Sequence, residues 1–341
     1  MAATIQDVAR AAGVSVGTVS RAMNNYPDIS AKTRERILKV AEELKYRPNL
    51  VAKSLSSKHS RDIALILSGF LEDAMFNDFE TMLMKGCYQF AFEHGLDISM
   101  YVINSRTQEE KSYEQLCYEH NIAGGIIFGI KSTDPYFTSL AESKNPCVTI
   151  DVEVSGENVS SVTNDHMAAF DELTQYLIDQ GHRRIALVCG RKNATVTAQR
   201  MDGAMRALER NGLKPPADSV IYTNFLKEEA TEGVTGFLKE HQDKGVTAFL
   251  CMSDLLAIGT VEALKEAGCR VPDDYSVVGY DGLYVTEYTD PRLTTVDQNI
   301  KDKGYEAAHL LFDMIEGRRS AQRLILPHKL EIRDSVKRLE I

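Results

Sequence analysis

The stretch VARAAGVSVGTVSRAMN, residues 8–24, contains two short helical patterns that meet at a glycine. The first pattern places apolar side chains on one helix face, at Ile5, Val8, Ala9 and Ala12. Thr4 stands where a helix N-cap is expected, and Gly13 stands where the helix would end in a left-handed residue. We therefore expect a short helix that stops at Gly13 and is followed at once by another.

The second and third helices follow the same pattern. Ser15 is placed to cap the second helix and Ser30 the third. The inward-facing positions are Val19, Ala22 and Met23 in one, and Ile37, Val40, Ala41 and Leu44 in the other. Gly17 and Arg21, four residues apart, share a different face of the second helix and should be exposed. Three short helices with a tight glycine turn predict a helix-turn-helix unit.

Such a unit predicts contact with DNA. In a helix-turn-helix the second helix enters the major groove, and its N-terminal residues reach the base edges. Arg21 would donate two hydrogen bonds to guanine O6 and N7, worth about 1–3 kcal/mol of discrimination, and Val16 would touch a thymine methyl group. Gly17 would allow a close approach to the groove. The alternative, on helical spacing alone, is a small three-helix bundle with a solvated Arg21.

The charge of the chain is unevenly distributed. The 341 residues carry a net charge of −10, yet residues 1–60 hold ten Lys and Arg against five acidic residues, a net charge of +5. The remaining residues therefore hold 29 basic and 44 acidic side chains, a net charge of −15. A basic head on an acidic body indicates that only the head meets a polyanion.

The first part of the chain closely resembles the DNA-binding head of the lactose-repressor/galactose-repressor (LacI/GalR) family of bacterial regulators. The matching residues are Thr4-Ile5-Gln6-Asp7-Val8-Ala9, Ala12-Gly13-Val14-Ser15, Thr18-Val19-Ser20-Arg21, Asn24, Ser30, Thr33-Arg34, Tyr46-Arg47-Pro48-Asn49, Ala52 and Leu55. The resemblance implies that Val16, Gly17 and Arg21 select the operator sequence. It also implies phosphate contacts, which position the head without specifying sequence, from Thr4, Ser15, Thr18 and Asn25.

A polar linker follows the head at residues 49–60. Asn49 could cap a single helical turn that carries Ala52, Lys53 and Leu55, although so short a helix is marginal alone. In the family, two such segments fold together in the minor groove, and the resemblance implies that Leu55 wedges into a central base step. The alternative is that Leu55 packs on the core. Lys53 stands where many relatives have arginine, so its minor-groove contact should be weaker or less specific.

The body, from residue 61 on, alternates apolar runs with amphipathic helices. Strand-like runs occur at 63–67, 98–102, 125–128 and 147–150, and again at 185–188, 220–222, 248–251 and 276–278. Helical patterns between them occur at 79–93, 166–180, 198–211 and 254–267. This βαβα alternation, broken near 160–165, predicts two doubly wound α/β subdomains, each with a parallel sheet.

The body pattern resembles the periplasmic-sugar-binding-protein type of sensor that the family carries behind its head. The resemblance therefore extends over nearly the whole chain, and it implies that the chain crosses between the subdomains more than once. The expected organisation is a helix-turn-helix domain at 1–48, a hinge at 49–60, and an effector-binding and dimerisation domain at 61–341. Subdomain one would span about 61–163 and 292–325, and subdomain two about 164–291 and 326–341.

Polar residues stand at the ends of several predicted strands, namely Asp151, Ser253-Asp254 and Asp281. Ligands of open α/β sheets bind beyond the carboxyl ends of the strands, which here means the cleft between the subdomains. Carboxylates and an arginine suit a polyol, because each can hold two hydroxyl groups in fixed directions. The family's effector-contact positions fall on Asp151, Arg200, Phe225, Asp254, Asp281 and Gln298. The alternative for each is a capping or inter-subdomain salt-bridge role.

One segment departs from the family pattern. Where many relatives have Asn-Pro-Phe-Phe or Asn-Pro-Phe-Tyr, this chain has Asn77-Asp78-Phe79-Glu80. We expect Asn77, Phe79 and Glu80 to line the mouth of the cleft. Since a carboxylate replaces one aromatic ring, either the ligand is unusually polar or cationic, or Phe79 alone stacks on it.

No motif indicates catalysis. The chain lacks GxxxxGK[ST] and HExxH, and its GxSxG match, Gly13-Val14-Ser15-Val16-Gly17, lies between two predicted helices and not at the strand-to-helix turn of a nucleophile elbow. The eight histidines lack metal-ligand spacing, and we expect His166 and His182 to be surface or capping residues. The six cysteines form no CxxC pair and should be buried free thiols. The apolar runs are too short to span a bilayer and the N-terminus does not resemble a signal peptide, so we expect a cytoplasmic protein without cofactor or metal.

Together these features predict a ligand-responsive repressor of carbohydrate-utilisation genes. It would bind a palindromic stretch of double-stranded operator DNA as a homodimer, and a small-molecule effector, a sugar or sugar derivative, in the inter-subdomain cleft. One alternative is a regulator of the same fold whose signal is a protein partner or a nucleobase. The other is a ligand-binding module or hydrolase with a vestigial head.

Overall fold

The computed structural model describes residues 3–23, 25–46, 62–69, 78–216, 218–241 and 245–340. The chain forms two compact units, residues 1–60 and residues 61–341, which we call the head and the body. Five residues that were predicted to contact DNA or the effector lie outside the described residues, namely Asn49, Ala52, Lys53, Leu55 and Asn77.

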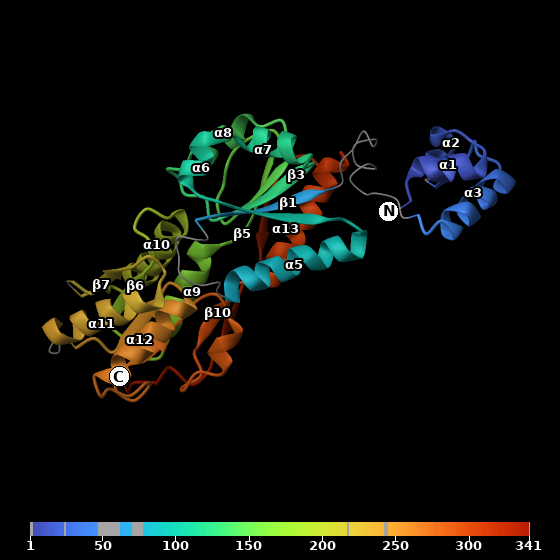
Figure 1. Cartoon of the computed structure of the whole chain (residues 1–341). Coiled ribbons are helices and arrows are strands. Elements are labelled where there is room, and N and C mark those ends of the chain that lie inside the picture. Colours follow the sequence, from blue (N-terminus) through green and yellow to red (C-terminus); the bar gives the residue numbers. More distant parts are fainter. Residues whose placement is uncertain are drawn as a thin grey trace. The chain divides into compact units, whose positions relative to one another are not determined.

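Local capping sets the ends of the three helices of the head, α1 (Ile5–Ala12), α2 (Val16–Met23) and α3 (Ala31–Glu43) (Figure 1). The Thr4 hydroxyl accepts the Asp7 amide at 3.3 Å, and the Asp7 carboxylate accepts the Thr4 amide at 2.9 Å, which completes a capping box. Ser15 and Ser30 each accept the amide three residues later, at 3.1 and 3.2 Å. Gly13 ends α1 at a φ of 65°, which confirms the predicted stop.

The head has a small apolar core formed by all three helices. Its buried members are Val8, Ala9, Ala12, Val19, Ala22, Ile37 and Ala41. Met23 and Val40 are partly buried against this core. The prediction that Leu44 packs inward is wrong: it is 37% exposed, because it is the C-cap residue of α3 and lies beyond the last helical turn.

The first part of the body is a six-stranded parallel sheet in the order β11-β5-β4-β3-β1-β2. Its strands are β1 (Ile63–Ser68), β2 (Ile98–Ile103), β3 (Gly124–Phe128), β4 (Cys147–Ile150), β5 (Val159–Asn164) and β11 (Arg323–Leu326). One face packs on α5 (Asp78–His94) and α13 (Ile300–Ile315). The other face packs on α7 (Tyr113–His120), α8 (Pro135–Ser139) and the short helix η1 (Leu140–Glu142), with α6 (Ser105–Glu110) beside α8.

The second part of the body is a four-stranded parallel sheet in the order β7-β6-β8-β9. Its strands are β6 (Ile185–Cys189), β7 (Val220–Tyr222), β8 (Ala248–Cys251) and β9 (Ser276–Val278). The helices around it are α9 (His166–Asp179), α10 (Thr195–Arg210), α11 (Lys227–His241) and α12 (Asp254–Glu266), followed by the short helix η2 (Tyr284–Glu287) (Figure 1). The predicted fold class, a helical head and two parallel-sheet α/β subdomains, is therefore confirmed.

The chain passes between the two sheets at three places in the described body. It leaves β5 for α9, it leaves β10 (Thr295–Asp297) for α13, and it leaves β11 for β12 (Lys329–Glu331), which pairs with β10. The Asn164 side-chain amide donates to the carbonyls of Leu326 and Pro327, each at 3.1 Å, and the Asn299 side-chain amide donates to Pro327 at 3.0 Å. The three connections are thus hydrogen-bonded to one another.

Four strands of the described body, β5, β10, β11 and β12, are absent from the eight strand-like runs predicted from the sequence, and β5 is the one buried within a sheet. The break predicted near 160–165 is β5, whose six residues are all buried between β4 and β11. Its side chains include Ser160, Ser161 and Thr163, which interrupt the apolar run by which buried strands are recognised. The buried Ser160 hydroxyl accepts a hydrogen bond from the Gln322 backbone amide at 3.0 Å. Burying this polar group therefore costs less free energy than the sequence suggests.

All six cysteines are free thiols, and five of them are buried, with Cys269 partly exposed. Among the described residues, no group of three His, Cys, Asp or Glu side chains is placed to hold a metal ion. None of the described helices is long and apolar enough to cross a membrane.

Candidate functional site

The outer face of α2 presents the residues that were predicted to contact base edges. Val16 is 42% exposed, and Gly17 and Arg21 are also exposed. Val19 and Ala22, on the inner face, are buried in the core of the head. The helix is thus anchored on one side and accessible on the other, which is the arrangement that a recognition helix requires.

Arg21 is held at the surface by side chains of the head itself. Its Nη2 lies 2.6 Å from the Asp28 carboxylate, and its guanidinium carbon lies 5.7 Å from the centre of the Tyr26 ring. Both members of the ion pair are about half exposed, and such pairs contribute only about 0–1 kcal/mol. Arg21 can therefore exchange Asp28 for a guanine at little cost.

Hydroxyl groups lie at the beginnings of α1 and α2. Thr4 and Ser15 are the N-cap residues, and the Ser15 hydroxyl lies 2.9 Å from the Thr18 hydroxyl. Helix N-termini offer unsatisfied amides and partial positive charge, which favour phosphate. Asn25 lies just past α2, exposed and in the left-handed conformation. Phosphate contacts by these four residues stay a prediction.

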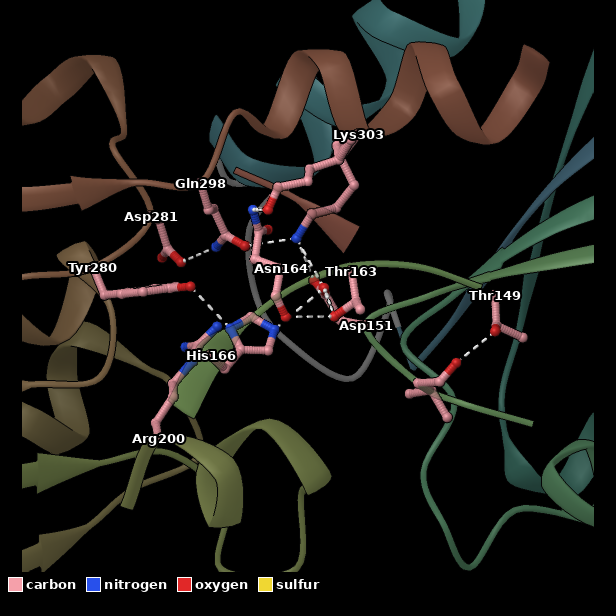
Figure 2. Close-up of polar contacts among 12 residues, drawn as sticks. Thr149, Asp151, Thr163, Asn164, His166, Arg200, Tyr280, Asp281, Gln298 and Lys303 are labelled. Atoms are coloured by element: carbon pink, nitrogen blue, oxygen red, sulfur yellow. Dashed lines mark hydrogen bonds and ion pairs between the residues drawn. The ribbon is translucent and has the colours of Figure 1, made fainter. Parts of the chain in front are cut away.

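The body contains a network of polar side chains between its two sheets. We call this network the polar cluster, and it consists of Asp151, His166, Tyr280, Asp281, Gln298 and Lys303 (Figure 2). At its centre, the Nζ of Lys303 lies 2.8 Å from both carboxylate oxygens of Asp151. The Lys303 side chain is 0% exposed and that of Asp151 9% exposed. Burial opposes ionisation of Asp151, but the Lys303 ammonium outweighs it and holds the pKa of Asp151 well below its usual range.

One arm of the polar cluster runs from Lys303 towards β9. The Lys303 ammonium also donates to the Gln298 side-chain oxygen at 2.6 Å, and the Gln298 amide donates to the Asp281 carboxyl at 2.7 Å. Gln298 lies on the connection from β10 to α13. This arm therefore joins the first sheet to the second through a residue of the crossing segment.

The other arm runs from Asp151 through His166. One ring nitrogen of His166 lies 3.3 Å from the Asp151 carboxylate, and the other lies 2.9 Å from the Tyr280 hydroxyl. Thr163 adds a hydrogen bond to Asp151 at 3.1 Å. Since Tyr280 and Asp281 are consecutive, the two arms close into a ring that includes two of the three crossings (Figure 2).

Arg200 lies beside this ring on α10 and is 4% exposed. Its Nη1 donates to the Met252 carbonyl at 2.5 Å, and its guanidinium carbon lies 4.2 Å from the centre of the Tyr280 ring. Phe225, in the left-handed conformation, places its ring 6.0 Å from the same carbon. That ring lies so close to Gly190 that a Cβ there would meet it at 1.8 Å, so only glycine fits.

Burial decides the protonation of the remaining groups. It raises the pKa of Asp281 to about 8, against the opposing charge of Arg200, and it lowers the pKa of His166 to about 4, with Arg200 acting in the same direction. At neutral pH Asp281 is therefore protonated and His166 is neutral. The fixed charges are the Asp151 carboxylate and the cations Lys303 and Arg200.

The other predicted effector residues have identifiable partners in the body. Burial raises the pKa of Asp254 to about 6, and its carboxyl accepts the Leu283 amide at 2.7 Å and the Thr295 hydroxyl at 2.5 Å. Ser253 caps α12. The Ser253 contact is that of the capping alternative, whereas the Asp254 hydrogen bonds join distant segments of the body, and effector contact by either residue stays a prediction.

The mouth of the predicted cleft is described only in part. Phe79 stacks on Phe128 with ring centres 5.2 Å apart, and its ring centre lies 5.9 Å from the Lys303 Nζ. Glu80 is half-buried on α5. Phe79 thus lies beside the polar cluster, whereas effector contact by Phe79 and Glu80 stays a prediction.

Sequence reasoning missed Lys303, His166 and Tyr280. The prediction that His166 and His182 are surface or capping residues is wrong, since each is 1% exposed. Both rings can be buried because they form hydrogen bonds with residues far away in the sequence. For example, a ring nitrogen of His182 lies 3.1 Å from the Lys337 carbonyl. Lys303 did carry a signal: it occupies a core position of α13, three residues after buried Ile300, where an unpaired lysine would be costly.

Comparison with known proteins covers both units. The family model described as bacterial regulatory proteins, lacI family, matches residues 4–49, and the model described as a periplasmic binding protein-like domain matches residues 174–336. The chain is 30% identical to the HTH-type transcriptional repressor PurR of Pasteurella multocida (strain Pm70) over 339 residues, which cover 98% of this chain and 99% of that protein.

Two solved structures extend the comparison to three dimensions. The lac repressor dimer bound to operator and the anti-inducer ONPF matches with a TM-score of 0.86 and 26% identity, over 99% of this chain and 100% of that one. A complex of the transcriptional regulator CelR with cellobiose matches with a TM-score of 0.74 and 30% identity, over 98% of this chain and 99% of that one. These relatives are transcriptional regulators and not enzymes.

Proposed function

This chain belongs to the lacI family of bacterial regulators, and we propose that it represses transcription from a palindromic operator as a homodimer that responds to a sugar or sugar derivative. The observation that carries the proposal is that one chain combines two features. The head has a helix, α2, with one face exposed, and the body has a buried polar cluster that joins its two sheets. A single head makes too few base contacts for a useful specificity ratio, and a two-fold dimer doubles them.

The proposal assigns a role to each part of the chain. Residues 1–48 are the DNA-binding domain, residues 49–60 the hinge and residues 61–341 the effector-binding and dimerisation domain. A ligand held by the polar cluster changes how the two subdomains of the body lie, because the cluster joins them. DNA affinity then changes if the ligand binds the two arrangements unequally.

Within the hinge, Leu55 of each protomer is proposed to wedge into the central base step of the operator. In the head, Val16, Gly17 and Arg21 contact base edges, while Thr4, Ser15, Thr18 and Asn25 contact phosphates. The proposal of a sugar effector is supported by the cellobiose complex of CelR, which is 30% identical to this chain. The name of the relative PurR keeps a nucleobase as the alternative that a ligand panel has to include.

Selection of binding sites from random-sequence DNA tests the proposal. The full chain at physiological salt should enrich a two-fold-symmetric sequence, with half-sites one helical turn or a multiple of it apart. Arg21→Ala should lose about 1–3 kcal/mol of discrimination at one base pair of each half-site. Lys32→Ala, a change at an exposed position of α3, is the control and should leave the preference intact. Enrichment of no sequence, or of one without symmetry, would contradict the proposal.

A further inference from the structure

Arg200 is a buried cation that the described part of the protein leaves without a counterion. Its hydrogen bond goes to a neutral backbone carbonyl, that of Met252, and its Nε has no hydrogen-bond partner among the described residues. The other contacts of its guanidinium in the described ranges are with the aromatic rings of Phe170, Phe225 and Tyr280. The Tyr280 ring at 4.2 Å offers attraction to the cation but no negative charge. A buried charge in this condition is costly unless something else pairs with it.

The acidic residues of the polar cluster do not supply that counterion. Both oxygens of Asp151 accept hydrogen bonds from Lys303, so this carboxylate and this ammonium neutralise each other. Asp281 accepts a hydrogen bond from Gln298, and its raised pKa of about 8 keeps it protonated at neutral pH. The charge of Arg200 therefore remains in excess.

Further hydrogen-bond donors gather at the beginning of α10. The N-cap residue, Ala194, has no side chain that can accept the first amides of this helix. Thr197, one turn before Arg200 on the same helix face, is 2% exposed, and its hydroxyl has no partner among the described residues. An uncapped helix start, a buried hydroxyl and a buried guanidinium are the groups that bind carboxylates and phosphates in proteins.

We propose that the effector of this regulator is an anionic polyol, a hydroxylated small molecule with a carboxylate or phosphate group, and that Arg200 and Thr197 bind its charged group. This inference rests on the proposed function, because it takes the polar cluster as part of the effector site. The hydroxyl groups of such a molecule have partners as well. The side-chain oxygen of Asn164, 1% exposed, is without a hydrogen-bond donor among the described residues and can accept a hydroxyl.

A cationic ligand fits the cluster less well. The ionised carboxylate of the cluster, Asp151, is already paired with Lys303, and a second cation would lie near Arg200 and Lys303. Like charges in a buried site repel each other strongly. A cationic polyol is therefore the compound class that should bind worst.

Thermal melting of the full chain tests the inference with matched compounds. The probes are glucose, glucuronate, glucose 6-phosphate and glucosamine, which are neutral, carboxylate-bearing, phosphate-bearing and cationic. At least one anionic probe should raise the melting temperature with an apparent Kd about ten- to a hundredfold below that of glucose, as expected for hydrogen bonds to a charged group. The two anionic arms distinguish a carboxylate from a phosphate effector.

Two arginine variants of α10 localise the effect. Arg200→Gln keeps a donor for the Met252 carbonyl but removes the charge, and it should abolish the preference for the anionic probe. Arg206→Gln removes an exposed charge that pairs with Asp171 on the outer side of the same helix, and it should keep the preference. Without ligand, Arg200→Gln should melt at or above the wild-type temperature, because it removes a buried unpaired charge, whereas a structural role for Arg200 would lower it.

Each outcome decides the inference. An anion preference that Arg200→Gln abolishes and Arg206→Gln retains supports it. Stabilisation by glucose or glucosamine equal to that by both anions overturns it but leaves the proposed effector site intact. No stabilisation by any of the four probes, with operator selection still successful, overturns the inference and counts against a sugar effector, and it favours the nucleobase alternative. Failure of operator selection is a separate result that contradicts the DNA-binding part of the proposed function alone.

Discussion

In the head, Arg21 pairs with Asp28 only seven residues along the chain and at the surface, whereas in the body Lys303 pairs with Asp151 across 152 residues and in the interior. The first pair is about half exposed to solvent, so Arg21 can exchange Asp28 for another partner at little cost. The second is enclosed and held by further hydrogen bonds on both sides. The difference fits the two proposed roles: a surface that binds DNA uses weakly held charges, while a site that joins two subdomains uses charges fixed by their surroundings.

The largest expected effect comes from breaking the two ion pairs separately. Lys303→Met leaves the Asp151 carboxylate buried without its counterion, and should lower the free energy of unfolding of the body by about 3–5 kcal/mol. Arg21→Met removes one partner of the exposed pair and should cost less than about 1 kcal/mol in the head. Denaturant unfolding of the full chain, followed by circular dichroism, measures both.

The double variant Lys303→Met with Asp151→Asn sharpens this result. Removing both charges together should recover part of the stability that Lys303→Met loses, because no unpaired ion remains buried. Equal losses from Lys303→Met and Arg21→Met, or no recovery in the double variant, would show that burial does not distinguish the two pairs.

The pH dependence of stability should differ between wild type and Asp281→Asn. The unfolded Asp281 carboxyl loses its proton near its ordinary pKa of 3.8, while the folded one keeps it until about pH 8. Its contribution is therefore complete below pH 4 and is lost as the pH rises through this window. Between pH 6 and pH 8 the wild type should lose up to about 3 kcal/mol relative to Asp281→Asn. Parallel stability curves for the two proteins over this range would mean that Asp281 is ionised in the fold.

The smallest effects concern two glycines of the head. Gly13 has a φ of 65°, so Gly13→Ala should destabilise the head by about 1 kcal/mol. Gly17 lies within α2, where a Cβ meets only the Ser15 hydroxyl at 3.7 Å, and Gly17→Ala should stabilise the head by about 0.5–1 kcal/mol. Thermal unfolding of the two variants shows whether the stability of the head falls with Gly13→Ala and rises with Gly17→Ala. If Gly17→Ala is stable yet binds operator more weakly, the lost affinity comes from close contact with DNA.

The head was predicted well from the sequence because its structure is local. Thr4, Gly13, Ser15 and Ser30 cap or end helices through partners only a few residues away. The bounds of α10 were predicted less well: it begins at Thr195 and not near residue 198, because Ala194 gives no capping signal. β5 was missed for a similar reason, since its polar side chains are satisfied by distant segments.

Three of the six residues of the polar cluster were among the predicted effector contacts: Asp151 and Asp281 from strand ends, and Gln298 from the family resemblance alone. Asp151 and Asp281 directly follow strand-like runs, so their meeting at the carboxyl ends of two sheets could be expected. Lys303 and His166 lie within helices, and nothing local indicates that they contact a residue of the other subdomain or sheet. Such contacts depend on the order in which the chain crosses between the sheets, which sequence periodicity does not encode.

The most direct test of the account is the operator affinity of the full chain with and without the probe that raises its melting temperature. Saturating probe should change the operator Kd by at least about fivefold, since allosteric coupling free energies are typically 1–3 kcal/mol. Arg200→Gln should bind the same operator but show no change with the probe. An operator Kd that stays constant at saturating probe would contradict the claim that the polar cluster of the body controls the head.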